Sequence, residues 1–222
     1  MSDYKSQLGQ DRFIDRHYKE KTNGVYLDIG AHNGLDYSNT YFLEKYRGWS
    51  GILIEPMDSE FKALKQNRSS DNFFFNCAVG DYNGETVFTQ IRDIDGTNNM
   101  ISGVKENLHP LHLDRIIRES SRHSSSNDPF ADGIVSDIVV PIRTLQDIMD
   151  ATGLYEFDFC SLDTEGSELS ILKGINFDKA NIRVFIIENN GYGSEPEITS
   201  FLDEKGYVKL CSIEWDDVYI KA

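Results

Sequence analysis

Acidic side chains follow most of the short apolar segments of this sequence, in the places where such segments end. They are Asp28, Glu55, Asp81, Asp163, Glu165 and Glu188, and Asn189 follows the last of them. A phosphate site would instead need glycine amides, a helix N-terminus and Lys or Arg side chains. Carboxylates at these positions favour ligands that bring hydroxyl groups, amines or a cation.

The loop after the first apolar segment holds Gly30 and Gly34, with Asp28 two residues before Gly30. Dinucleotide-binding loops have the pattern G-x-G-x-x-G, which packs backbone amides on a pyrophosphate, and this loop lacks it. Asp28 can accept hydrogen bonds from an ammonium group, and Glu55 can accept both hydroxyls of a ribose. These residues predict S-adenosylmethionine, a phosphate-free adenosine with an amino acid tail. The alternative is that the glycines serve only a tight strand-to-helix turn.

Five apolar segments predict five buried strands, at 25–30, 51–56, 73–80, 157–163 and 184–188. Their apolar residues are continuous rather than alternating, which is typical of parallel strands with both faces covered. Helical patterns lie between them, at 37–46, 61–64, 169–172 and 197–205. Segment 207–220 alternates and turns near Trp215, which predicts an antiparallel hairpin at a sheet edge. The expected fold class is therefore α/β, with a doubly wound, mostly parallel sheet.

Seven stretches of the chain, in this order, resemble the FkbM family of S-adenosylmethionine-dependent O-methyltransferases. They are SQLGQD (6–11), DIGAHNG (28–34), SNTYFLE (38–44), GILIEP (51–56), AVGD (78–81), SLDTEGSE (161–168) and IENN (187–190). The resemblance covers nearly the full length. It implies the class I methyltransferase (Rossmann-like) fold and methylation of hydroxyls of sugars, glycans or natural products.

The resemblance also implies a set of cofactor-binding residues. It places Asp28, Gly30 and Asn33 around the methionine part of the cofactor and Glu55 on the ribose. It also places Ala78 and Asp81 beside the adenine, and Gln10 and Asp11 in an N-terminal segment folded over the cofactor. For Gln10 and Asp11 the alternative is a polar first turn of a helix. His32 departs from the residues common in the family's loop and is given no role.

A base for a hydroxyl proton is expected at the far end of the cleft, because ligands of parallel α/β sheets bind at the carboxyl ends of the strands. Asp163 is the first choice and Glu165 the second. The structural alternatives are that Asp163 caps a helix and that Glu165 stabilises the dipole of its first turn. His109 or His112 is a further candidate base.

The same strand ends also permit a second mechanism. Asp163, Glu188 and Asn189 offer oxygen atoms of the kind that Mg²⁺ or Mn²⁺ prefers. A bound cation would lower the pKa of a coordinated hydroxyl and orient it.

The chain is expected to form a single methyltransferase domain over 1–222 with a polar, lid-like insertion at about 91–137. The insertion carries two serine clusters and three of the five histidines, His109, His112 and His123. Such long segments are typically functional lids or mobile loops, and the two alternatives stay open.

The composition limits the range of partners. Of 222 residues, 22 are Lys or Arg and 37 are Asp or Glu, a formal net charge of -15. Such a surface repels phosphate backbones and anionic lipids, so nucleic acid and membrane partners are not expected. Cys77, Cys160 and Cys211 lie among apolar residues and are expected to be buried reduced thiols. With no long uncharged run, the protein is expected to be cytoplasmic.

Together with the resemblance, these observations predict an O-methyltransferase that uses S-adenosylmethionine to modify a hydroxyl of a sugar or glycan. The acceptor class is mainly what the resemblance implies. The alternatives are a small natural product or a protein side chain as acceptor, or a non-catalytic binding module on the same fold. A nicotinamide oxidoreductase is disfavoured because the pyrophosphate loop is missing.

Overall fold

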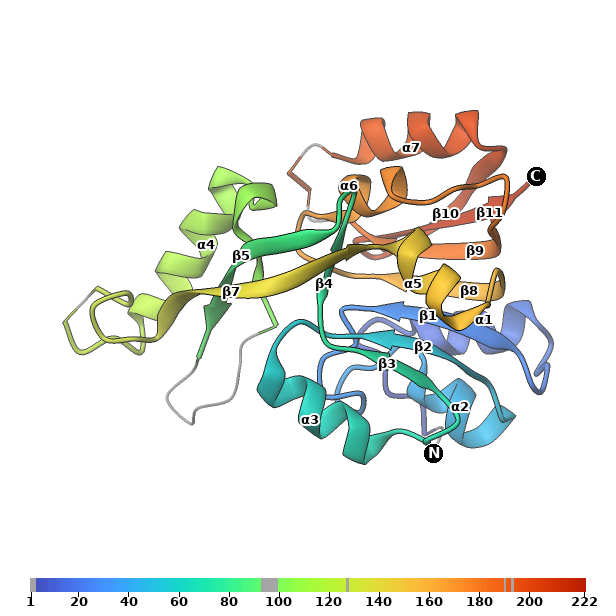
Figure 1. The fold of residues 1–222 in the computed structure, drawn as a ribbon, viewed down its shortest axis with the longest axis horizontal. Coiled ribbons are helices and arrows are strands. Elements are labelled where there is room, and N and C mark those ends of the chain that lie inside the picture. Colours follow the sequence, from blue (N-terminus) through green and yellow to red (C-terminus); the bar gives the residue numbers. More distant parts are fainter. Residues whose placement is uncertain (1–2, 93–99, 127, 190, 193) are drawn as a thin grey trace.

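The computed structural model describes residues 3–92, 100–126, 128–189, 191–192 and 194–222. Its main element is a seven-stranded sheet with the order β10-β11-β9-β8-β1-β2-β3 (Figure 1). The strands are β1 (Val25–Ile29), β2 (Ser50–Ile54), β3 (Phe73–Phe75), β8 (Glu156–Leu162), β9 (Asn181–Glu188), β10 (Tyr207–Ile213) and β11 (Asp216–Lys221). The five from β9 to β3 are parallel, and β11 and β10 form an antiparallel hairpin at one edge.

Helices cover both faces of this sheet because successive residues of each strand point to opposite sides. Leu27 and Ile29 of β1 pack with three helices on one face, and Tyr26 packs with three others on the second face. The first group is α5 (Leu145–Thr152), α6 (Glu168–Lys173) and α7 (Glu195–Glu204); the second is α1 (Gln10–His17), α2 (Tyr41–Arg47) and α3 (Asp58–Asn67). The predicted doubly wound, mostly parallel α/β sheet with its C-terminal antiparallel hairpin is confirmed.

The predicted strand 73–80 is wrong as a single strand. It divides into β3, which pairs with β2, and β4 (Ala78–Gly80), which pairs with β7 (Val135–Thr144) in a second sheet. The side chain of Asn76 donates hydrogen bonds to the backbone oxygens of Glu55 and Pro56. These bonds hold the chain where it leaves the main sheet, so the ladder ends at Phe75.

The second sheet has the order β4-β7-β5-β6, with β5 at Gly84–Ile91 and β6 at Gly103–Val104. Strands β5 and β7 and helix α4 (Pro110–Ser121) extend beyond the main sheet in Figure 1. Part of the predicted insertion 91–137 is therefore ordered structure, namely β6, the short helix η1 (Lys105–Asn107), α4 and the start of β7. Residues 93–99 and 127 of that prediction lie outside the described residues.

Two helices begin at different residues than the sequence pattern predicts. Helix α2 begins at Tyr41 rather than at position 37, because the Ser38 hydroxyl accepts hydrogen bonds from the backbone N–H of Thr40 and Tyr41. Helix α7 begins earlier than predicted, at Glu195, with a proline in its first turn. Within the described part of the chain, no helix has the length and apolar character needed to cross a membrane.

Candidate functional site

A cavity of about 590 Å³ lies along the carboxyl ends of the parallel strands. It is lined by residues at these ends: Gly30 after β1, Glu55 after β2, Ala78 of β4, Asp163 after β8 and Glu188 of β9. The chain runs from β1 outward to β2 and β3, then returns to continue at β8 and β9 on the other side. The cavity therefore spans the topological switch point between β1 and β8, where such sheets bind ligands.

Glu55 sits at the end of β2 and is only 4% exposed. Its Oε1 accepts a hydrogen bond from the Met57 N–H at 2.8 Å, and its Oε2 accepts one from the His32 N–H at 3.0 Å. Burial raises the pKa of Glu55 to about 8, although these two hydrogen bonds oppose the increase. Each carboxylate oxygen keeps a second lone pair for a ligand hydroxyl.

Gly30 allows the loop after β1 to approach the end of β8 closely. Its φ is +85°, and a Cβ atom there would lie 1.9 Å from the backbone oxygen of Asp163. Only glycine fits both conditions without strain. The loop is held from the other side by hydrogen bonds from the N–H groups of Gly30 and Ala31 to the Ile54 oxygen.

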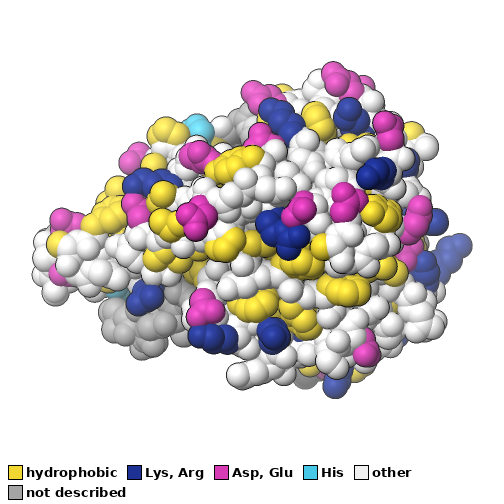
Figure 2. All heavy atoms as spheres, in the orientation of Figure 1, with side chains coloured by type: hydrophobic (Ala, Val, Ile, Leu, Met, Phe, Trp, Pro, Cys, Tyr) yellow, Lys and Arg dark blue, Asp and Glu magenta, His cyan; other side chains and the backbone are white. Residues whose placement is uncertain are grey.

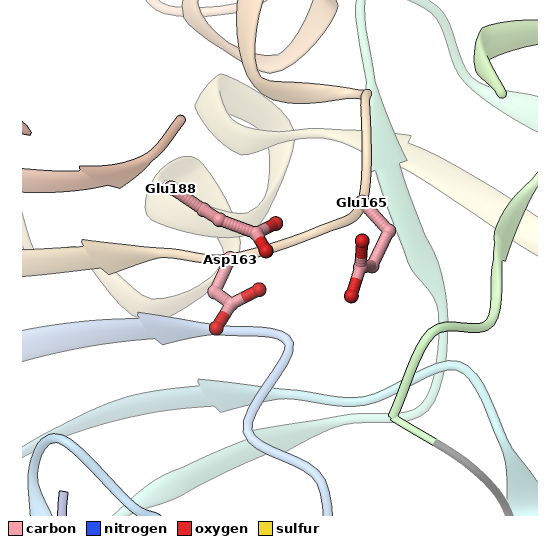
Figure 3. A group of neighbouring side chains, drawn as sticks. All are labelled: Asp163, Glu165 and Glu188. Atoms are coloured by element: carbon pink, nitrogen blue, oxygen red, sulfur yellow. The ribbon is translucent and has the colours of Figure 1, made fainter. Parts of the chain in front are cut away.

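Three carboxylates converge at the β8 and β9 end of the cavity. Asp163, Glu165 and Glu188 each offer an oxygen atom within 4.8 Å of the others (Figure 3). Asp163 and Glu188 are hydrogen-bonded to each other. Partial removal from water raises the pKa of both groups. Repulsion from a neighbouring carboxylate raises it further, chiefly from Asp216 for Asp163 and from Asp163 for Glu188. Asp163 is nevertheless reached by solvent through the cavity.

The structural alternatives for Asp163 and Glu165 are wrong. Helix α6 begins at Glu168 and its N-cap is Ser167, so Asp163 does not cap it and Glu165 lies before its first turn. Glu168 is the acid of that turn, and its Oε1 accepts hydrogen bonds from the N–H and hydroxyl of Thr164 and from the N–H of Gly166.

Asn189 lines the cavity but is not a member of the carboxylate group. Its side-chain N–H₂ donates to Asp217 at 3.1 Å and its Oδ1 accepts from the Gly191 N–H at 3.1 Å. The structure thus brings Glu165, rather than Asn189, together with Asp163 and Glu188.

Five residues predicted to bind the cofactor do not line the cavity: Gln10, Asp11, Asp28, Asn33 and Asp81. Gln10 and Asp11 open helix α1, as the structural alternative for them expects. Gln10 donates to Asp216 at 2.5 Å, and the oxygens of Asp11 accept from Lys5, Ser6 and Arg12. The N-terminal segment reaches the cavity through Gln7 instead.

The other three residues support the loops around the cavity. Asp28 accepts a short hydrogen bond from the Thr40 hydroxyl and lies 3.9 Å from the buried Arg68, and burial raises its pKa. Asn33 accepts from the N–H groups of Leu35 and Asp36, a local turn within the loop. Asp81 accepts from the Ser170 hydroxyl at 3.2 Å. Direct contact of these residues with a cofactor stays a prediction.

Sequence reasoning missed cavity residues that come from outside the five strand ends. Arg115 and Glu119 reach the cavity from α4, and Trp215 reaches it from the β10–β11 turn with 53% of its surface exposed. An exposed tryptophan at a hairpin turn is a signal that could have identified the last of these. His109 and His112 do not line the cavity.

Comparisons with known proteins agree on one class. A family model described as "Methyltransferase FkbM domain" matches residues 28–209. "Methyltransferase sdnD" from Sordaria araneosa is 22% identical over 201 residues, which cover 84% of this chain and 74% of that protein.

Solved structures with some likeness include methyltransferase FkbM from Methylobacillus flagellatus KT, at 18% identity and a TM-score of 0.49. That match covers 89% of this chain and 43% of the other, so this chain spans less than half of its length. The N-terminal domain of human METTL16 is 14% identical with a TM-score of 0.42, covering 95% of this chain and 67% of that one.

Proposed function

Because the chain belongs to the FkbM methyltransferase family, we propose that it transfers the methyl group of S-adenosylmethionine to a hydroxyl group of a sugar or glycan. The observation that carries this proposal is the convergence of Asp163, Glu165 and Glu188 at one end of the cavity. Carboxylates accept hydrogen bonds from hydroxyl groups, and several together suit a neutral, hydroxyl-rich acceptor. Trp215 adds an apolar ring surface of the kind that packs against the C–H groups of a sugar.

The residues of the cavity fit the cofactor. Glu55 presents a carboxylate that is already fixed by two backbone N–H groups, and it can accept the two ribose hydroxyls. Glu55 follows β2 and Asp163 follows β8, with β1 between the two strands, so the strands lie about 10 Å apart. With the ribose at Glu55, the proposed orientation directs the sulfur end of the cofactor toward the carboxylate group.

Bound S-adenosylmethionine supplies an electrophilic methyl group on a positively charged sulfur. Asp163 accepts the proton of the acceptor hydroxyl as the new carbon–oxygen bond forms and the carbon–sulfur bond breaks. Holding the acceptor in line supplies much of the rate, because orientation replaces a large entropy cost. Glu188 and Glu165 accept hydrogen bonds from neighbouring hydroxyls and so align the acceptor.

The same group of carboxylates supports a second candidate mechanism with Mg²⁺ or Mn²⁺. The predicted ligands are Asp163, Glu188 and Asn189, and the position of Glu165 favours that residue in place of Asn189. A cation there would orient the acceptor hydroxyl and lower its pKa.

The test is methyl transfer from cofactor labelled in the methyl group to separate panels of free sugars and glycans, small aromatic and terpenoid alcohols, and peptides. Label in a sugar methyl ether is the expected result. Label confined to the alcohols or peptides would replace the acceptor class, and the absence of cofactor binding in calorimetry would favour a non-catalytic module.

A further inference from the structure

His112 lies on α4, far from the strand ends in sequence, and is 1% exposed. Its Nε2 is 3.0 Å from the backbone oxygen of Ile101. A carbonyl oxygen only accepts hydrogen bonds, so Nε2 is the nitrogen that carries a hydrogen and donates it. This bond fixes the orientation of the imidazole ring.

The fixed ring directs its second nitrogen at the carboxylate group of the cavity. Nδ1 of His112 lies 3.4 Å from Oε2 of Glu165. Nδ1 of the neutral ring and a carboxylate oxygen both accept, so this contact is a hydrogen bond only when one of the two side chains carries an additional proton. The ring edge also packs against Tyr192, with centroids 5.7 Å apart and an angle of 80°. His112 is thus held by Ile101 in the insertion and by Tyr192 in the loop after β9, while it contacts the loop after β8.

Glu165 is a residue whose position depends on such support. Its φ is +58°, a left-handed conformation that non-glycine residues keep only where their surroundings impose it. Glu165 is buried, and its Cβ and backbone oxygen lie beside Gly103 of the insertion. His112 is one of the groups that the carboxylate of Glu165 contacts.

We propose that His112 is a positioning residue that holds the Glu165 carboxylate toward Asp163 and Glu188, so that helix α4 completes the acceptor end of the site. The expected effect of His112 on activity rests on the proposed function, whereas its expected effect on the position of Glu165 does not. The proposal requires one hydrogen between Nδ1 and Oε2, carried either by the imidazole or by the Glu165 side chain.

Two conservative variants separate the two contacts of the ring. His112→Asn keeps a side-chain amide near the position of Nδ1 and loses the contact with Ile101. His112→Gln keeps an amide near the position of Nε2 and loses the contact with Glu165. We expect His112→Gln to lower kcat by about 10- to 100-fold with little change in the KM for the cofactor, and His112→Asn to retain kcat within about fivefold.

The matched control is His109→Asn. His109 begins the same helix and stacks on the same Tyr192, and asparagine caps helices well, so we expect activity within about twofold of wild type. In a Glu165→Ala background, adding His112→Gln should cost less than a further twofold, because the carboxylate that His112 contacts is already absent. The reverse order, with His112→Gln active and His112→Asn inactive, would show that His112 only anchors Ile101 and would overturn the proposal.

Crystal structures of the two His112 variants provide the arm that does not depend on activity. Displacement of the Glu165 carboxylate in His112→Gln but not in His112→Asn is the expected result, even if the wild-type protein methylates none of the acceptors offered. An unmoved Glu165 in His112→Gln, in a protein that does transfer methyl groups, would refute the positioning role and leave the proposed function intact.

Discussion

Glu55→Gln tests the cofactor end of the cavity, where the geometry is most constrained. Both oxygens of Glu55 already accept backbone N–H groups, at 2.8 and 3.0 Å, and the side chain is 4% exposed. Glutamine replaces one acceptor oxygen by an N–H₂ group that faces a backbone N–H and cannot accept a ribose hydroxyl. The loss of one hydrogen bond to a charged group costs about 1.5–3 kcal/mol of binding free energy. We therefore expect the Kd for methylthioadenosine to rise roughly 10- to 150-fold.

The wild-type protein should also show a pH dependence that the variant lacks. Burial raises the pKa of Glu55 to about 8, so the free protein carries a proton there at neutral pH. Ribose hydroxyls donate to the ionised form, and binding must therefore release this proton. With a pKa of about 8, affinity increases about tenfold from pH 7 to pH 9 and levels off above that range. Glu55→Gln should give a flat profile.

The assay is calorimetry with methylthioadenosine, which keeps the adenosine and lacks the titrating amino acid of the cofactor. Its 2′-deoxy analogue should bind wild type more weakly and distinguish poorly between wild type and Glu55→Gln. The matched control is Glu85→Gln, which removes an exposed carboxylate on β5 that does not line the cavity, and the Kd of this variant should stay within about threefold of wild type. If Glu55→Gln binds methylthioadenosine like wild type, with the same pH slope, the assignment of the ribose to Glu55 is wrong.

Three further outcomes follow from the site and its supports. Asp163→Asn should lower kcat by about 10²–10⁴-fold while the Kd for S-adenosylhomocysteine, measured by calorimetry, changes little, and near wild-type turnover would remove Asp163 as the base. Turnover should persist in EDTA if that base acts alone, whereas a loss restored by Mg²⁺ or Mn²⁺ would establish the metal mechanism instead. Arg68→Met should lower the free energy of unfolding by about 3–5 kcal/mol in urea denaturation, because it leaves the buried Asp28 and Glu44 without their cation. The control is Lys62→Met, which removes an exposed ion pair, and equal stabilities of the two variants would show that Arg68 has no such role.

The main sheet could be predicted because its strands are continuous apolar segments. The segment 73–80 could not be divided from its composition, since the break depends on hydrogen bonds from Asn76 to residues about twenty positions earlier. Helix α5 carried a signal that was missed: Thr144 caps it by accepting from the Asp147 N–H, and Gly153 ends it. Helix α4 was missed because polar residues interrupt its apolar positions within a polar segment.

The candidate site was predictable to the level of strand ends and no further. Parallel strands bring Asp163 and Glu188 to one edge of the sheet whatever their side chains do. Which neighbour joins them depends on distant partners: Asp217 on β11 holds the Asn189 amide, and His112 on α4 lies against Glu165. Neither contact has a signature in the local sequence.

We expect the nucleoside of the cofactor to lie across the ends of β1 and β2, with its sulfur toward the carboxylates that follow or end β8 and β9. A crystal structure with S-adenosylhomocysteine would show this position. Both ribose hydroxyls should lie within hydrogen-bond distance of Glu55, and the sulfur should face the group formed by Asp163, Glu165 and Glu188. A ribose bound elsewhere, or a sulfur directed away from these carboxylates, would contradict this expectation.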